Sequence, residues 1–297
     1  MSTVVWQRRV TCPAKLNLGL WVLGKRADGF HALESLVVQT EWGDELELCL
    51  HDEPGDDSLT CDVSELPTDS SNLVMKAVRL FRERHGIKGR AAFSLTKRIP
   101  WGGGLGGGSA DGAWALRLLN EAHGHPLSPD QLLELAAQLG SDVPLFLHDE
   151  PVWMRGRGEV IETVSPELVA RLSGLYVTVA HPGFPVETPW AYKHLAAQRA
   201  YSPVELAQAG REAWAQPGLP PHSALHNDFR AVVDAKYPTV PLVLAQLNAV
   251  DGVRAQMSGS GSACVALYEA VEAQDAVANV LREAWGEQAC VVQTRLR

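Results

Sequence analysis

The chain has 297 residues, of which 46% are hydrophobic and 21% are charged, a balance close to that of average globular proteins. This composition argues against disorder, coiled coil and collagen, and the length predicts two domains or one large domain. A formal net charge of −9 makes general binding to nucleic acid or to an anionic membrane a poor expectation, although a local phosphate site remains compatible with it.

The first half of the chain alternates strand-like runs with helices that carry recognisable ends. Asn72 stands at the start of one helix, and Ser128, Pro129 and Gly140 mark the limits of another. The acidic stretch 53–71 is typical of a loop or a short excursion of the chain. The expected strands are 4–10, 14–23, 33–40, 44–51, 91–98 and 158–163, and the expected helices are 72–85, 110–122 and 129–139.

The second half continues the mixture, so the chain is predicted to have an α+β or α/β fold. A domain junction is expected near Ser165-Pro166, which gives an N-terminal domain of residues 1–165 and a C-terminal domain of residues 166–297. The expected strands here are 175–181, 253–257, 263–268 and 288–294, and the expected helices are 189–199, 203–214, 227–235, 240–250 and 270–284.

Localisation and metal content are predicted from simple patterns. The five cysteines are scattered and odd in number, and the ten histidines show no metal spacing, so we expect reduced thiols and no structural metal. The N-terminal run MSTVVWQRRV has no apolar signal segment, and no stretch of 18 apolar residues occurs. We therefore expect a cytoplasmic protein without a membrane span. Asp44, Glu45 and Glu47 are interpreted as the solvent face of a strand.

A glycine-rich segment between a strand and a helix is the strongest local signal. Gly102–Gly104 and Gly106–Gly108 place six glycines in seven residues, directly before the helix expected at 110–122. Such density has an entropic cost and is typical of backbone that approaches a ligand closely. Backbone N–H groups at the start of a helix favour phosphate. A phosphate-binding loop is therefore predicted, and a flexible linker is the alternative.

Other phosphate-binding loops fit this segment poorly. No Lys follows the glycines, as a Walker A loop requires, and the match to the dinucleotide pattern G-x-G-x-x-G is weak because six glycines satisfy almost any spacing. The downstream HRD and DFG motifs of protein kinases are absent. A dehydrogenase is accordingly the least favoured interpretation.

Three motifs together resemble the GHMP kinases, the family of galactokinase, homoserine kinase, mevalonate kinase and phosphomevalonate kinase. The first motif is Pro13-Ala14-Lys15-Leu16-Asn17-Leu18, the second is the segment Pro100–Ala110, and the third is Met257–Cys264. Further segments are similar to one branch of the family. They are the run PAKLNLGLWVLGKRADGFHALESL, the segment Gly140–Phe146, and the segment His181–Gly183 with Thr188-Pro189. Members of that branch phosphorylate the 2-hydroxyl of 4-diphosphocytidyl-2-C-methyl-D-erythritol in non-mevalonate isoprenoid biosynthesis.

The resemblance implies an α+β fold with the two-domain GHMP architecture and an active site in the cleft between the domains. It also implies ATP as phosphoryl donor, Mg²⁺ carried mainly by ATP, and a small-molecule substrate with a cytidine diphosphate group. The expected assembly is a monomer or a weak homodimer. A homoserine-type or mevalonate-type kinase is one alternative, and a nucleotide sensor without catalysis is another.

The catalytic candidates are Lys15 and Asp142. By pattern alone, Asp142 is a turn residue and Lys15 is a strand-edge lysine in solvent. The resemblance implies instead that Asp142 receives or orients the proton of the substrate hydroxyl and that Lys15 lies beside it. Ser109 is interpreted either as the N-cap of the following helix or as a hydroxyl contact to phosphate or Mg²⁺.

The resemblance also implies the binding residues. Asn17 shares a strand face with Lys15 and is expected to hold the erythritol part. Three residues are expected to recognise the cytosine, namely Phe30, His31 and Tyr192. At position 30 a Tyr is more usual in the family. The expected ATP contacts are Pro100, Trp101, Gly102, Gly103, Gly104, Leu105, Gly106, Gly107, Gly108, Ser109, Ala110, Asn72, Leu73 and Lys97, and the expected substrate contacts are Asn17, Phe30, His31, Thr188 and Tyr192.

Overall fold

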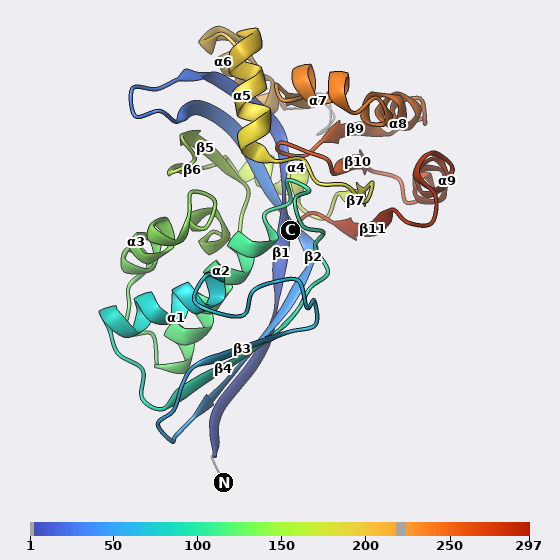
Figure 1. Ribbon diagram of the computed structural model, residues 1–297. Helices are drawn as coiled ribbons and strands as arrows, with labels where there is room; N and C mark the ends of the chain where they lie inside the picture. Colours follow the sequence, from blue (N-terminus) through green and yellow to red (C-terminus); the bar gives the residue numbers. More distant parts are fainter. Residues whose placement is uncertain (1–2, 218–223) are drawn as a thin grey trace. The chain divides into compact units, whose positions relative to one another are not determined.

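The structure is a computed structural model, and it describes residues 3–217 and 224–297. It has mixed α and β structure, as expected, and its described strands form two sheets (Figure 1). The contacts group the chain into two compact units that interleave in sequence. Of the described residues, the first unit contains 3–14, 42–99 and 106–149, and the second contains 15–41, 100–105, 150–217 and 224–297. The expected boundary near residue 165 instead cuts the sequence once into two continuous domains, and it stays a prediction.

Two long strands run through both units and replace the four short strands expected there. β1 extends over Val4–Lys25 and β2 over His31–His51. The expected gaps at 11–13 and 41–43 contain Pro13 and Gly43, which made a break plausible. Both strands continue through these positions, and Gly43 lies so close to β1 that a Cβ there would be 1.9 Å from the Cys12 carbonyl oxygen.

In the first unit, three helices pack on one another, and the first of them contacts a short strand of the larger sheet (Figure 1). Asn72 and Ser128 cap helices as expected, and Gly140 ends the second of them. The acidic stretch 53–71 contains a short strand that sequence analysis missed. The elements are β3 (Ser58–Cys61), α1 (Leu73–Arg84), β4 (Arg90–Thr96), α2 (Gly107–Ala122), α3 (Pro129–Leu139) and the 3₁₀ helix η1 (Pro144–Leu147).

The second unit contains a four-stranded antiparallel sheet in the order β11-β7-β10-β9, against which α8 and α9 pack (Figure 1). Its core is formed by buried apolar side chains, among them Val233, Leu244 and Met257. The strands are β5 (Val152–Gly156), β6 (Val160–Thr163), β7 (Tyr176–His181), β8 (His226–Asn227), β9 (Arg254–Met257), β10 (Cys264–Tyr268) and β11 (Cys290–Arg295). The helices are α4 (Pro166–Leu172), α5 (Thr188–Gln198), α6 (Val204–Ala215), α7 (Arg230–Lys236), α8 (Thr239–Asn248) and α9 (Ala273–Trp285).

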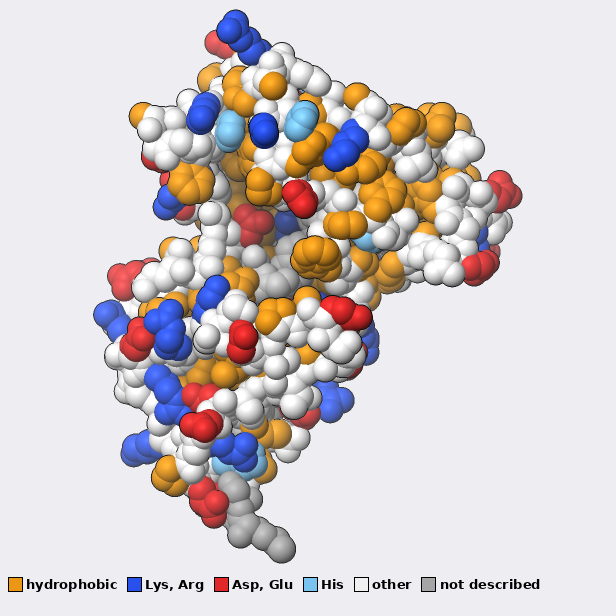
Figure 2. All heavy atoms as spheres, viewed as in Figure 1, with side chains coloured by type: hydrophobic (Ala, Val, Ile, Leu, Met, Phe, Trp, Pro, Cys, Tyr) orange, Lys and Arg blue, Asp and Glu red, His pale blue; other side chains and the backbone are white. Residues whose placement is uncertain are grey.

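The larger sheet has the order β3-β4-β2-β1-β8, and β5 and β6 extend it from β2. β2 pairs with β4 over residues 45–51 and with β5 over residues 33–37. Within the described residues, no helix is long and apolar enough to cross a membrane. On the face drawn in Figure 2, basic and acidic side chains are interspersed, so that neither sign forms a continuous patch there.

Candidate active site

The glycine segment turns through left-handed backbone at every second residue. Gly102, Gly104 and Gly106 have φ values of 71°, 76° and 74°, which side chains with a Cβ rarely adopt. Gly106 is the N-cap of α2, and the helix begins at Gly107 rather than at the expected residue 110. Ser109 therefore lies in the first helical turn and is not the N-cap, which corrects one of its two interpretations.

The start of α2 has the geometry of an anion site. The first N–H groups of a helix have no acceptor within the helix, and the helix dipole places positive charge there. Gly108 is exposed, and a Cβ added to it would meet only Leu73 Cδ1, at 4.0 Å. Ser109 in the same turn is half-buried. These donors and this open space suit a phosphate group.

The first part of the glycine segment belongs to the second unit and packs closely against other residues of that unit, which is a second reason for glycine at these positions. A Cβ at Gly102 would lie 2.4 Å from Pro185 Cβ, and one at Gly103 would lie 2.8 Å from His181 Cδ2. Val186 donates its N–H to the Gly102 carbonyl at 3.1 Å. Trp101 beside them is 77% exposed. The linker interpretation does not account for a segment held by so many close contacts.

His181 lies at the end of β7 and is buried against Gly103. Its Nδ1 accepts the Gly183 N–H at 3.2 Å, so the ring proton lies on Nε2. Burial lowers the pKa of His181, so the ring stays uncharged at neutral pH. Nε2 is buried and has no hydrogen-bond partner among the described residues.

Lys15 and Asn17 are buried on one face of β1, as the alternation predicted. Lys15 Nζ donates to Asn17 Oδ1, and Asn17 Nδ2 donates to the Ser35 hydroxyl at 2.8 Å. The Lys15 backbone N–H donates to the Leu105 carbonyl at 2.9 Å, so the backbone of β1 is hydrogen-bonded to the glycine segment at this point. Lys15 is therefore not the strand-edge lysine in solvent that its pattern alone suggested.

The third motif forms a buried loop, Ser258–Ala263, which we call the late loop. Ser258 Oγ accepts the Asn17 N–H and donates to the Gly104 carbonyl, both at 3.3 Å. Ala263 donates its N–H to the Gly103 carbonyl at 3.2 Å. A Cβ at Gly259 would lie 3.1 Å from Lys15 Nζ. The late loop thus brings the first and second motifs together, and Thr188 Oγ1 meets Ser260 Oγ at 2.8 Å at its edge.

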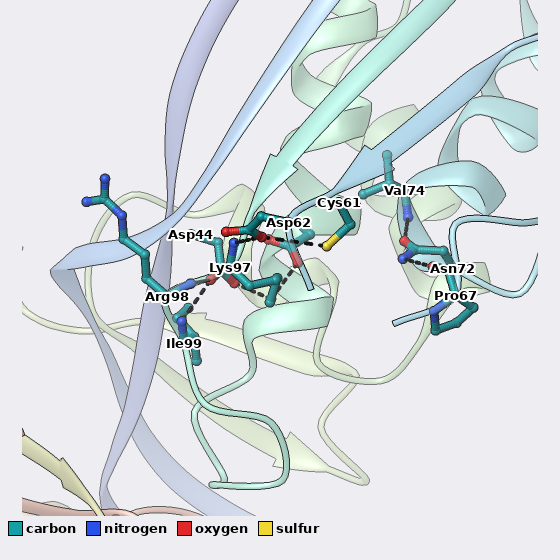
Figure 3. Close-up of polar contacts among 10 residues, drawn as sticks. Asp44, Cys61, Asp62, Pro67, Asn72, Val74, Lys97, Arg98 and Ile99 are labelled. Carbon is teal, nitrogen blue, oxygen red and sulfur yellow. Dashed lines mark hydrogen bonds and ion pairs between the residues drawn. The ribbon is translucent and has the colours of Figure 1, made fainter. Parts of the chain in front are cut away.

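Asn72 and Lys97 lie in the first unit, where Figure 3 shows their contacts. Asn72 accepts the Val74 N–H at 2.9 Å and donates to the Pro67 carbonyl at 2.8 Å. The oxygen and the nitrogen of its carboxamide are therefore both hydrogen-bonded to nearby backbone. Leu73 is half-buried beside Gly112, whose Cβ would lie 3.1 Å from Leu73 Cβ. The predicted ATP contacts of these residues stay predictions.

Lys97 forms ion pairs with two buried carboxylates, Asp44 and Asp111, the latter at 2.9 Å. Burial lowers the pKa of the Lys97 ammonium, but the two carboxylates outweigh it and raise the pKa above its usual value. Asp44 also accepts the N–H groups of Arg98 at 2.6 Å and Ile99 at 2.8 Å (Figure 3). The interpretation of Asp44 as part of a solvent face was wrong, because the side chain has no exposed surface.

Asp111 lies in the second turn of α2 and is buried. Its burial, together with the neighbouring charge of Asp44, raises the pKa of Asp111 to about 7 although Lys97 opposes the shift. A Cβ at Gly107 would lie 3.1 Å from Asp44 Oδ2, so the Asp44 carboxyl group lies directly beneath the first turn of α2.

The residues expected to recognise cytosine are close in space but do not form an open sandwich. His31 stacks directly on Tyr192, with ring centroids 4.6 Å apart and planes at 19°. At that spacing no base fits between the two rings. Phe30 is half exposed, and the Arg157 guanidinium lies 5.0 Å from its ring centroid. Burial and the charge of Lys25 lower the pKa of His31, which favours a neutral imidazole.

Asp142 lies between α3 and η1 in the first unit and is half-buried. Lys15 belongs to the second unit, so the expected pairing of the two stays a prediction. No group of three or more His, Cys, Asp or Glu side chains suited to a metal ion occurs in residues 3–217 and 224–297.

Sequence reasoning missed two kinds of polar residue near these loops. Asp44 and Asp111 were not predicted, because their partner Lys97 comes from a different part of the chain. Asn227 was also missed, although its amide group donates to two carbonyls that flank Ser258, those of Met257 and Gly259. A lone Asn in a short strand gives no local signal of such a role.

Comparison with known families finds two matches. Residues 72–150 match the GHMP kinases N terminal domain, and residues 204–287 match the GHMP kinases C terminal domain. Both matched ranges include parts of the sites described above.

Individual relatives match nearly the whole chain. The 4-diphosphocytidyl-2-C-methyl-D-erythritol kinase of Chlorobium phaeobacteroides is 37% identical over 271 residues, 91% of this chain and 92% of the relative. The kinase of the same name from Methylacidiphilum infernorum is 40% identical and covers 86% and 84%. A crystal structure of 4-(cytidine 5′-diphospho)-2C-methyl-D-erythritol kinase matches with a TM-score of 0.77 at 32% identity, over 97% and 99% of the chains. Homoserine kinase from Cytophaga hutchinsonii shares the fold, with a TM-score of 0.71 at 20% identity over 95% of each chain.

Proposed function

This chain belongs to the GHMP kinases, and on that premise we propose that it transfers the γ-phosphoryl group of ATP to the 2-hydroxyl of 4-diphosphocytidyl-2-C-methyl-D-erythritol. The observation that carries the proposal is the agreement among relatives of 34–40% identity, matched over most of their length, which are named as kinases of this compound. The reaction is a step of the non-mevalonate route to isoprenoid precursors.

The residues present suit a nucleoside triphosphate. We assign its phosphates to the first turn of α2, where the helix supplies N–H donors and Gly108 leaves space. Mg²⁺ neutralises phosphate charge, and the hydroxyl of Ser109 is the protein group that we assign to phosphate or metal. Asn72, Leu73 and Lys97 are assigned to the adenosine part, and the side chain of Lys97 is already positioned by Asp44 and Asp111.

The chemical step needs an oriented hydroxyl and compensation of negative charge. We assign the first task to Asp142, which accepts the proton of the 2-hydroxyl or holds it in line with the phosphoryl group. The second task falls to Lys15, whose ammonium is buried among polar groups of β1 and the late loop. Asn17 and Thr188 are assigned to the substrate beside them.

The cytidine part is assigned to Phe30, His31 and Tyr192. Because His31 and Tyr192 touch each other, we place the base on an outer face of this pair rather than between its rings. A neutral His31 has one ring nitrogen for the edge of a base, because its Nε2 already lies 3.4 Å from the Tyr201 hydroxyl. The domain division at residue 165, the cytoplasmic location and the monomeric or weakly dimeric state remain parts of this proposal.

The test is ADP release from Mg·ATP with the cytidyl compound, with homoserine and with mevalonate in parallel. Turnover with the cytidyl compound alone is the expected result. Faster turnover with homoserine or mevalonate would contradict the substrate assignment and leave the family intact. ATP binding without turnover of any of the three would favour a nucleotide sensor.

A further inference from the structure

Asn227 is a buried residue that the reaction as described above does not use. It lies in β8, which pairs in parallel with β1 at Gly19 and Leu20. Only 5% of its surface is exposed. Nδ2 donates to the carbonyls of Met257 at 2.7 Å and Gly259 at 2.9 Å, and Oδ1 accepts the Phe229 N–H at 3.0 Å. Both amide protons of one side chain are therefore committed to the backbone where the late loop begins.

One of the two carbonyls that Asn227 holds belongs to Gly259, which lies beside Lys15 and the glycine segment. Gly259 has a φ of 57°, and a Cβ there would lie 3.0 Å from the Gly104 carbonyl oxygen and 3.1 Å from Lys15 Nζ. Neighbouring atoms of the late loop hold Gly103 and Gly104 through Ala263 and Ser258. A shift of Gly259 would therefore change the surroundings of Lys15 and of the glycine segment together.

We propose that Asn227 is a positioning residue, which fixes the late loop so that Lys15 and the backbone of Gly103 and Gly104 keep their places during phosphoryl transfer. No other residue type of this size supplies two donors and one acceptor in this arrangement. Asp would bring only acceptors against two carbonyl oxygens, and Leu would leave both carbonyls buried without a donor. The kinetic part of this inference rests on the proposed kinase activity, whereas its effect on nucleotide binding does not.

If Asn227 only stabilised the fold, its replacement would lower Tm without a specific effect on kcat or ADP affinity. The chain offers a matched control for such a structural role. Asn120 is equally buried, at 4% exposure, and its carboxamide also bridges the backbone: it donates to the Leu127 carbonyl at 3.0 Å and accepts the Leu127 N–H at 2.9 Å. It lies near the far end of α2, about 20 Å along the helix from Gly107 at 1.5 Å per residue. Asn120→Asp removes the same donor without touching the late loop.

The experiment compares Asn227→Asp, Asn227→Ser and Asn120→Asp with the parent in the full chain, by thermal unfolding, by titration with ADP and by steady-state kinetics. The Ser variant keeps one small donor and serves if the Asp variant does not fold. For the Asn227 variants we expect a loss of about 10-fold in kcat and about 5-fold in ADP affinity, against less than about 2-fold for Asn120→Asp at a similar loss of Tm.

Asn227 variants with the ADP affinity and kcat of Asn120→Asp would overturn the inference. A parent protein that binds ADP but phosphorylates no tested alcohol would count against the proposed function. In that case the ADP titration alone decides the role of Asn227, because it does not depend on the identity of the alcohol.

Discussion

The α-carbon of Gly104 faces the backbone carbonyl of Ser258 so closely that a Cβ on residue 104 would lie 2.3 Å from that oxygen. Two glycine-containing loops separated by about 150 residues in sequence thus meet backbone to backbone. The glycines of the segment consequently serve two purposes. Gly102, Gly103 and Gly104 permit close packing with the protein itself, whereas Gly108 borders open space, where a phosphate is expected.

This division predicts opposite results for two Gly→Ala substitutions. Gly104→Ala combines a φ of 76° with an overlap at Ser258, so we expect a loss of about 3 kcal/mol in the free energy of unfolding. Gly108→Ala lies within α2, where Ala is favoured by up to about 1 kcal/mol, and should leave Tm unchanged or slightly higher. Its methyl group should instead raise KM for ATP. Thermal unfolding and ATP kinetics of both variants measure this, and equal Tm values would contradict the packing argument.

Trp101 offers a direct signal of nucleotide binding. It is 77% exposed beside Gly102, which Val186 holds through a backbone hydrogen bond. If it contacts ATP as predicted, titration with Mg·ADP should change the intrinsic fluorescence. The fractional change should be small because the chain has nine tryptophans. Trp101→Phe should abolish the change while ADP still binds, and a change that persists in this variant would assign the signal to another tryptophan.

Local patterns predicted the features that depend on a few neighbouring residues. The caps Asn72 and Ser128 and the stop at Gly140 were correct because capping is decided within four residues. The glycine segment was recognised because its composition alone is unusual. The start of α2 was misplaced by three residues, because glycine has low helix propensity and the packing of Gly107 over Asp44 and Ile99 overrides it.

Residues whose partners come from distant segments could not be predicted in the same way. Asp44 stands in a run that alternates acidic and apolar residues and looked exposed, yet its partners at residues 97–99 and 111 bury it. Asn227 has no neighbour in sequence that indicates contact with Gly259. The three family motifs indicated a common family, but the contacts of the late loop with Lys15 and Gly104 were seen only in the structure.

Tyr192 should contribute to the affinity for the cytidyl substrate. Its ring supports His31, so Tyr192→Leu removes both an aromatic face and the packing that orients the imidazole. We expect KM for the cytidyl compound to rise about 10-fold, with KM for ATP changed less than about 2-fold. Tyr176→Leu is the matched control, because Tyr176 also stacks on an aromatic ring, that of Tyr268, and has no assigned contact with the substrate. An unchanged KM in Tyr192→Leu would remove this residue from the cytidine site.

Asp111 makes the stability of the protein depend on pH in an unusual direction. Its folded-state pKa of about 7 is above the ordinary value of 3.8, so the folded protein takes up a proton there, and stability is lost as pH rises from about 4 through 7. Asp111→Asn removes this titration but keeps an acceptor for Lys97. We expect the variant to gain, relative to the parent, on the order of 2 kcal/mol between pH 5 and pH 8. Denaturant unfolding at both pH values measures this, and a constant difference would contradict the role of Asp111.

The pairing of Lys15 with Asp142 is tested by a double-mutant cycle. Asp142→Asn keeps the shape of the side chain but not its basicity, so kcat should fall about 100-fold or more with little change in either KM. Lys15→Met removes the ammonium while retaining a chain that can pack on Asn17, and should lower kcat similarly. If the two groups act on the same hydroxyl, the double variant should lose scarcely more than either single one, because the first substitution already disables the pair. Multiplying losses would indicate two independent roles, and an Asp142→Asn variant with nearly parental kcat would remove Asp142 from the chemistry.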